Sequence, residues 1–206
     1  MNNLQTIHEF IDYTKRLKGD EKGEAQLFCD RLFRAFGHGG IIEANGQLEA
    51  RIKFNETGRT KFADCLWSPD GRDGVLIEMK KRGEKNLESH FPQVRDYWIE
   101  MNPEKVLGPG SQKPKYIILC NFERFIIYKQ LSRVDEVTIE EFADRASAFN
   151  FLLVEEKEPI FENNVEAISQ DASRAIGEVF KYLVFDKRED RQTAQRFLLQ
   201  TVLALF

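Results

Sequence analysis

The chain has 206 residues, of which 42% are hydrophobic and 31% are charged, a balance typical of folded globular proteins. Its formal net charge of -4 argues against a protein that grips nucleic acid mainly through bulk positive charge, but it is compatible with a nucleic-acid enzyme whose site is acidic. The first residues lack the pattern of a secretory signal, and no apolar run approaches the roughly 20 residues that span a bilayer. We therefore expect a cytoplasmic protein with no membrane contact, and reduced core cysteines at Cys29, Cys65 and Cys120.

Two amphipathic helices are predicted near the start of the chain. Apolar residues recur at helical spacing over residues 3–18, and again in the segment that Glu24 opens and Gly37 ends. Glu24 precedes Leu27 and Phe28, which we assign to the buried stripe of the second helix, so its carboxylate is expected near that stripe. The alternative is an ordinary first-turn acid that interacts with the helix dipole.

After Gly40 the hydrophobic period changes from helical to alternating. Three strands are predicted at residues 48–54, 61–67 and 75–80, with turn signals at 55–59 and 68–74. We expect a helix over about 88–101, a loop over 102–114, a strand buried on both faces over 115–122 and a strand paired with it over 122–131. This order predicts an α/β fold, in which a central mixed sheet, built from an antiparallel meander plus further strands, is flanked by helices.

The composition shifts near Val154. Residues 155–164 are acidic and polar, and two helices are expected at roughly 163–184 and 189–206, separated by residues 185–190. We therefore predict a core over residues 1–153, and an acidic boundary followed by a C-terminal helical extension over 154–206. Apolar residues run to the last position without a cap, so we expect the chain to be a piece of a longer polypeptide.

Ionisable residues interrupt two of the predicted core strands. Residues i and i+2 share a face of a strand, so Glu78 and Lys80 point the same way, and Asp64 lies on the partner strand. Converging charges in such a place are costly unless they compensate one another or bind an ion. Two carboxylates suit Mg²⁺, and a lysine beside them can orient or help deprotonate a water and stabilise developing negative charge, which favours phosphodiester hydrolysis.

Simpler interpretations remain open for these residues. Glu78–Lys80 or Asp64–Lys80 could be an ordinary ion pair. The basic residues that follow the third strand could contact a phosphate backbone, or could form a solvated strand end; they are Lys81, Arg82 and Lys85. Gln93 lies on the helix that follows.

At these residues the sequence resembles the PD-(D/E)XK nuclease superfamily, and more closely the N-terminal endonuclease domain of MmeI-type fused restriction–modification enzymes. The similar segments include GEAQLFCDRLFRAFG, FADCLW, VLIEMKKRG, QVRDYW and YIILCNFERFIIY, in the order of the family. The resemblance implies a restriction-endonuclease-like core, with residues 154–206 leading to downstream domains. The sequence departs from the pattern in having Ala63 rather than proline before Asp64, and a longer gap between Asp64 and Glu78.

The resemblance also implies roles for residues and partners. Asp64, Glu78 and Lys80 would be the catalytic set, with Asp64 and Glu78 as ligands of Mg²⁺, for which Mn²⁺ would substitute; Glu24 and Gln93 would support the site. Double-stranded DNA would be the substrate, and dimerisation would serve double-strand cleavage. The same polypeptide would continue into a target-recognition domain and an adenine-specific methyltransferase, which would use S-adenosylmethionine. The alternative function is a non-catalytic nuclease-like module for DNA docking or assembly.

Overall fold

The protein is described here by a computed structural model, which covers residues 3–53, 60–69, 72–155, 157–162 and 174–205. The chain divides into two compact units, Met1–Glu162 and Asn163–Phe206. The first unit extends past Leu153 to Glu162, because Phe161 packs against its core and the Ile160 amide donates a hydrogen bond to the Ser147 carbonyl.

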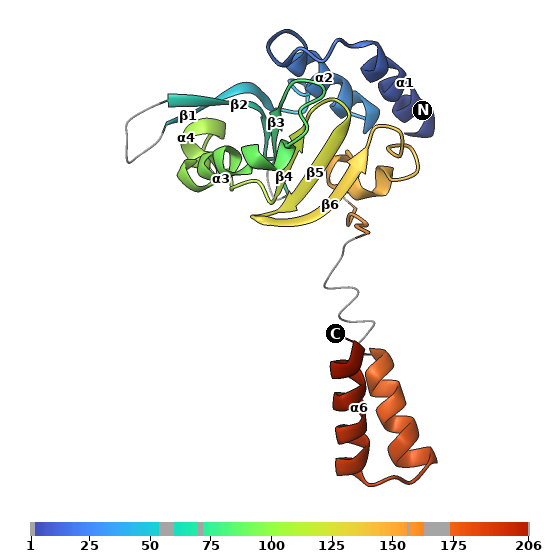
Figure 1. Ribbon diagram of the computed structural model, residues 1–206. Coiled ribbons are helices and arrows are strands. Elements are labelled where there is room, and N and C mark those ends of the chain that lie inside the picture. Colours follow the sequence, from blue (N-terminus) through green and yellow to red (C-terminus); the bar gives the residue numbers. More distant parts are fainter. Residues whose placement is uncertain (1–2, 54–59, 70–71, 156, 163–173, 206) are drawn as a thin grey trace. The chain divides into compact units, whose positions relative to one another are not determined.

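A sheet of six strands forms the centre of the first unit (Figure 1). In chain order the elements are α1 (Asn3–Arg16), α2 (Glu21–Ala35), β1 (Gln47–Lys53), β2 (Thr60–Trp67), β3 (Val75–Met79), η1 (Leu87–His90), α3 (Phe91–Glu100), α4 (Pro103–Leu107), β4 (Tyr116–Cys120), β5 (Arg124–Lys129), β6 (Ser132–Thr138) and η2 (Ala146–Leu152). The strands lie side by side in sequence order; β3 and β4 are parallel, and every other neighbouring pair is antiparallel. The predicted mixed sheet, with its antiparallel meander and flanking helices, is confirmed.

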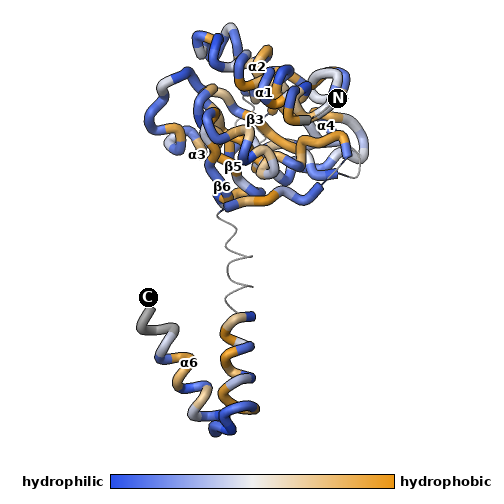
Figure 2. Tube along the Cα trace, turned by 90° about the vertical axis from the view of Figure 1, so that its right-hand side faces the viewer, coloured by the Kyte–Doolittle hydropathy of each residue, from blue (hydrophilic) through white to orange (hydrophobic). Residues whose placement is uncertain are grey.

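The parallel step from β3 to β4 explains where the helices lie. Parallel neighbours require a crossover, and η1, α3 and α4 supply it on one face of the sheet. Helices α1 and α2 and the 3-10 helix η2 pack on the opposite face, where phenylalanines from the three elements belong to one core cluster with residues of the strands. Figure 2 shows hydrophobic and hydrophilic residues alternating along these outer helices, as expected of elements with one buried side.

Strand β4 is buried along its whole length, which confirms the expectation for residues 115–122. Cys29, Cys65 and Cys120 are buried free thiols, as predicted. The expectation that Leu27 is part of the buried stripe is wrong: its side chain is 55% exposed, because α2 packs through residues one step further round the helix.

Some elements differ from the sequence-based expectation. The predicted loop over 102–114 contains the short helix α4, whose first turn is capped by the Asn102 side chain. Strand β6 was not predicted, because it is largely polar and only Asp135 and Val137 are buried. The turn expected at 55–59 lies outside the described residues, as do residues 70–71 of the turn expected at 68–74.

The second unit is described from residue 174 onward. Residues 174–181 are α-helical and continue into a π-helical turn, η3 (Tyr182–Asp186), and α6 spans Arg191–Leu205. The break between the helices is shorter than the expected 185–190: η3 continues to Asp186, and residues 187–190 separate it from α6. The Asp190 carboxylate caps α6 by accepting hydrogen bonds from the backbone of its first turn. The part of the predicted helix over 163–173 lies outside the described residues. Of the helices in the described ranges, none has the length and hydropathy needed to cross a membrane.

Candidate active site

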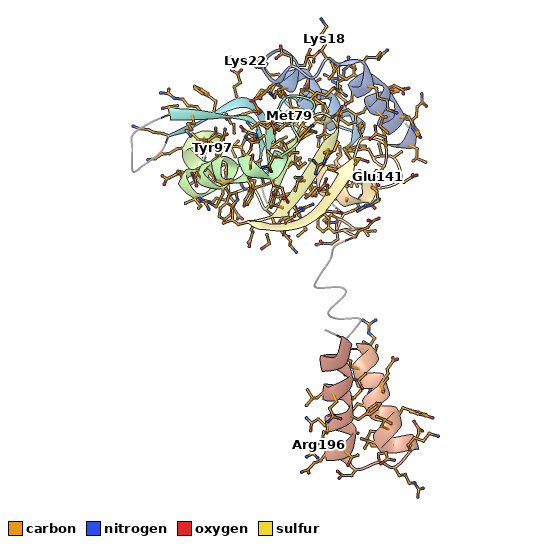
Figure 3. The ribbon with its side chains drawn as sticks, viewed as in Figure 1. Lys18, Lys22, Met79, Tyr97, Glu141 and Arg196 are labelled. Atoms are coloured by element: carbon orange, nitrogen blue, oxygen red, sulfur yellow. The ribbon has the colours of Figure 1, made fainter. Side chains whose placement is uncertain are left out.

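Strands β2 and β3 separate at the residues that the sequence singled out. Cys65 and Ile77 are the last paired residues, and the next position on each strand is Asp64 and Glu78. The Asp64 carboxylate replaces a backbone partner there: its Oδ2 accepts a hydrogen bond of 2.7 Å from the amide of Met79. Met79 lies between α2 and α3 in the view of Figure 3. The hydrogen bond from the Met79 amide holds the Asp64 side chain beside the end of β3.

Glu78 is the most deeply buried acid of the site, with 3% of its surface exposed. Its Oε1 accepts hydrogen bonds from Lys80 Nζ at 2.7 Å and from Gln93 Nε2 at 2.8 Å. Its Oε2 is buried and has no hydrogen-bond partner among the described residues. A buried carboxylate oxygen without a partner is costly, so it marks a position where a further group is expected.

Lys80 follows directly after β3 and is also buried, at 7% exposure. Its amide donates to the Cys120 carbonyl at 2.7 Å, which places its backbone beside the end of β4. The ammonium group lies 2.7 Å from Glu78 Oε1 and 3.4 Å from Glu21 Oε1. The lysine is therefore held between a strand acid and a helix acid.

Helix α3 supports Glu78 through an amide side chain. Gln93 Nε2 donates to Glu78 Oε1 and also to the Tyr97 hydroxyl, at 2.6 Å. Gln93 and Tyr97 are four residues apart, so they lie on the same face of the helix. Tyr97 is 3% exposed and belongs to the core beneath α3. The sequence indicated Gln93 but not Tyr97, although the i, i+4 spacing was a usable signal.

The acid that α2 contributes is Glu21, not the expected Glu24. The helix begins at Glu21, three residues earlier than predicted, because Asp20 is its N-cap and accepts a hydrogen bond from the Lys22 amide. Glu24 instead folds back onto the preceding turn, where its oxygens accept from the amides of Lys18 at 3.2 Å, Gly19 at 2.6 Å and Asp20 at 2.9 Å. The hydrogen bond from Asp20, with help from the other two, lowers the pKa of Glu24.

Burial dominates the electrostatics of the three central residues. It raises the pKa of Asp64 to about 6, and burial together with the nearby charge of Asp64 raises the pKa of Glu78 to about 7. Burial opposes the charge of Lys80 as well, but the contact with Glu78 and the field of the neighbouring acids outweigh it, so the pKa of Lys80 is raised. The lysine is therefore a cation at neutral pH, and the carboxylates would be stabilised by a further positive charge.

A comparison with known families decides the identity of the chain. A family model described as "MmeI, N-terminal domain" matches residues 2–186. The chain belongs to this family. The resemblance to MmeI-type proteins expected from the sequence motifs is thus confirmed.

The chain was also compared with solved structures and with curated proteins. The search of solved structures includes a chain described as "cryoEM structure DrdV-DNA complex", which is 12% identical, with a TM-score of 0.47. The match covers 87% of this MmeI N-terminal domain and 16% of the other chain, so the domain corresponds to a small part of that protein's length. No curated protein matches.

The donor set of this MmeI N-terminal domain fits a hard divalent cation. Asp64 and Glu78 offer carboxylate oxygens at neighbouring positions, and Oε2 of Glu78, which has no hydrogen-bond partner within the described ranges, is the kind of oxygen that such a cation prefers. Within the described ranges no group of three or more His, Cys, Asp or Glu is placed to hold a metal. Two carboxylates would therefore leave the remaining positions to water, an arrangement that Mg²⁺ tolerates well.

The three basic residues after β3 have different surroundings. Lys81 and Lys85 are exposed. Arg82 is engaged in the fold: its guanidinium donates to Glu123 at 3.2 Å and to the Thr14 carbonyl at 2.8 Å. A phosphate would have to compete with these bonds for the Arg82 guanidinium. For the exposed Lys81 and Lys85, contact with a phosphate backbone stays a prediction.

Proposed function

We propose that this domain is the Mg²⁺-dependent endonuclease module of a fused type II restriction–modification protein, and that it hydrolyses phosphodiester bonds in DNA. The observation that carries the proposal is the convergence of Asp64, Glu78 and Lys80 where β2 and β3 separate. Membership of the MmeI N-terminal domain family supports it.

Asp64 and Glu78 would hold the metal ion, and Mn²⁺ would substitute for Mg²⁺. When bound, such an ion supplies Lewis-acid stabilisation of phosphoryl oxygens and activation of water. Gln93 and Lys80 both donate hydrogen bonds to Oε1 of Glu78, so Oε2, which has no hydrogen-bond partner among the described residues, would be available to the ion. The amide of Met79 similarly fixes one oxygen of Asp64.

Lys80 would act as a cation rather than as a base. Its raised pKa and its contacts with Glu78 and Glu21 keep the ammonium protonated, so it can orient a water molecule and stabilise negative charge that develops on the phosphate. Gln93 positions Glu78 and is itself held by Tyr97. Both act through the carboxylate rather than on the substrate.

A simpler interpretation treats Glu78 and Lys80 as a structural ion pair, and their 2.7 Å contact is consistent with it. An ion pair alone does not explain why a second acid, Asp64, lies at the same place, nor why Oε2 of Glu78 is buried without a hydrogen-bond partner in the part of the chain that the structure describes. A site that holds a cation accounts for both features.

The remaining roles follow from the family. The substrate would be double-stranded DNA in the cytoplasm, recognised by a target-recognition domain further along the same polypeptide. A methyltransferase domain of that polypeptide would use S-adenosylmethionine, and two copies of the nuclease would associate transiently to cut both strands. The extent of the family match, residues 2–186, leaves these domains to the rest of such a protein.

The test is cleavage of supercoiled plasmid by the purified chain at high concentration in Mg²⁺ or Mn²⁺. The proposal predicts nicking by the wild type and by Lys105→Ala, a control at an exposed lysine on α4, and none by Lys80→Ala or in EDTA. Nicking by Lys80→Ala at the wild-type rate would refute the assigned site.

A further inference from the structure

The β1–β2 hairpin has one covered face and one open face. Ala50 and Ile52 on β1, and Ala63 on β2, are buried in the core beneath α3. Residues directly opposite one another in an antiparallel pair share a face, and successive residues alternate. Arg51 is paired with Phe62, so these two lie together on the face turned away from α3.

The open face combines two cations with an exposed aromatic ring. Arg51 and Lys53 are two residues apart on β1 and are both exposed, and neither pairs with a carboxylate of the described residues. Phe62 is 56% exposed. More than half of the Phe62 side chain is therefore available for contact with a ligand, beside the exposed cation Arg51 with which it is paired.

The strand that carries Phe62 also reaches the candidate active site. Phe62 is two residues before Asp64 on the same strand, and the register places Arg51 across from Phe62. Nearer the site, Glu49 on β1 is exposed, and its Oε1 accepts a hydrogen bond of 2.9 Å from Gln26 Nε2 of α2. Figure 1 shows β1 and β2 extending past α2, with α3 and α4 on the opposite side. The chain thus has a basic, aromatic surface that ends at an acidic site.

We propose that the open face formed by Arg51, Lys53 and Phe62 is a docking surface for duplex DNA, which positions the scissile phosphate beside Asp64. The inference rests on the proposed nuclease function. The two cations would contact the phosphate backbone, and the ring of Phe62 would pack against sugars or base edges in a groove. Charge complementarity favours DNA as the occupant: although the chain carries a net charge of -4, this face carries the exposed cations Arg51 and Lys53, with the exposed acid Glu49 on the side nearer the candidate active site.

The experiment measures binding of the full chain to a fluorescent duplex in EDTA, over a series of salt concentrations. The double variant Arg51→Gln/Lys53→Gln is compared with Arg95→Gln/Lys105→Gln, which removes two exposed cations from α3 and α4. We expect the first pair to weaken binding about tenfold and to lower the salt slope by about 2, and the control pair to leave both near the wild-type values.

Phe62→Ala tests the aromatic contact independently of charge. It should weaken binding about fivefold or more without changing the salt slope, and melting temperatures should stay at the wild-type value because Phe62 is exposed. The proposal would be overturned if Arg51→Gln/Lys53→Gln and the control pair had equal affinity and salt slope. It would also be overturned if the wild type bound the duplex no better than Arg51→Gln/Lys53→Gln. Either result would indicate that this face binds a protein partner instead. Binding is measured without metal, so failure of plasmid cleavage would count against the nuclease function while leaving this result intact.

Discussion

Replacing Asp64 by asparagine removes the negative charge of this side chain and keeps its shape. The asparagine side-chain oxygen can still accept the hydrogen bond from the Met79 amide, so the end of β3 keeps its partner. What is lost is a negative charge that burial makes unfavourable. The substitution should therefore stabilise the metal-free protein at neutral pH while removing a ligand.

The magnitude follows from the pKa of Asp64, which burial raises from 3.8 to about 6. A rise of this size corresponds to about 3 kcal/mol against the charged form in the folded state. The asparagine amide also loses water when it is buried, so we expect a net gain of about 1 to 2 kcal/mol in the free energy of unfolding. Both proteins are neutral at this position below about pH 4, so the gain is absent there, grows as the pH rises to about 6 and stays constant above it.

The assay is urea unfolding in EDTA at about pH 4 and about pH 8, repeated at the higher pH with Mg²⁺. Asp144→Asn, at an exposed aspartate, is the control for loss of one surface charge. We expect Mg²⁺ to stabilise the wild type and the control but not Asp64→Asn. If Asp64→Asn is no more stable than the wild type at about pH 8, or if its gain in stability is the same at both pH values, burial does not disfavour the charge of Asp64.

Three further predictions concern stability and catalysis. The double change Glu78→Gln/Lys80→Met should leave the urea midpoint unchanged or raise it, because a buried pair is removed whole, yet abolish plasmid nicking; retained nicking would contradict the site. Glu24→Ala should lower the melting temperature by a few degrees but leave Mg²⁺ affinity unchanged by calorimetry, since Glu24 serves the turn before α2. Gly19→Ala should cost about 2 kcal/mol or more by urea unfolding, because a Cβ at φ +80° would overlap Arg82; wild-type stability would contradict this.

The sheet and the central trio were predictable because both follow from strand geometry. Alternation placed Glu78 and Lys80 on one face, and the meander placed Asp64 on the neighbouring strand. The register then brings Asp64 and Glu78 to adjacent positions. Buried runs such as β4 were recognisable because a strand covered on both faces is apolar throughout.

The supporting residues were harder to predict, because they depend on local hydrogen bonds that the hydrophobic pattern does not encode. Glu21 and Glu24 are less than one helical turn apart, and only the cap at Asp20 and the amides of the preceding turn decide which of them reaches Lys80. The Asp20-Glu21 pair was a capping signal that could have been read. Strand β6 escaped detection because a sheet-edge strand with few buried residues has a weak apolar pattern.

The proposed cation site of Asp64 and Glu78 can be tested by calorimetric titration of Mn²⁺ into the metal-free chain at about pH 8, beside the Glu78→Gln variant. We expect saturable binding by the wild type that weakens as the pH falls below about 7, since the Glu78 carboxyl must lose its proton, and no such binding by the variant. Equal Mn²⁺ affinity in the two proteins would show that Glu78 is not a metal ligand.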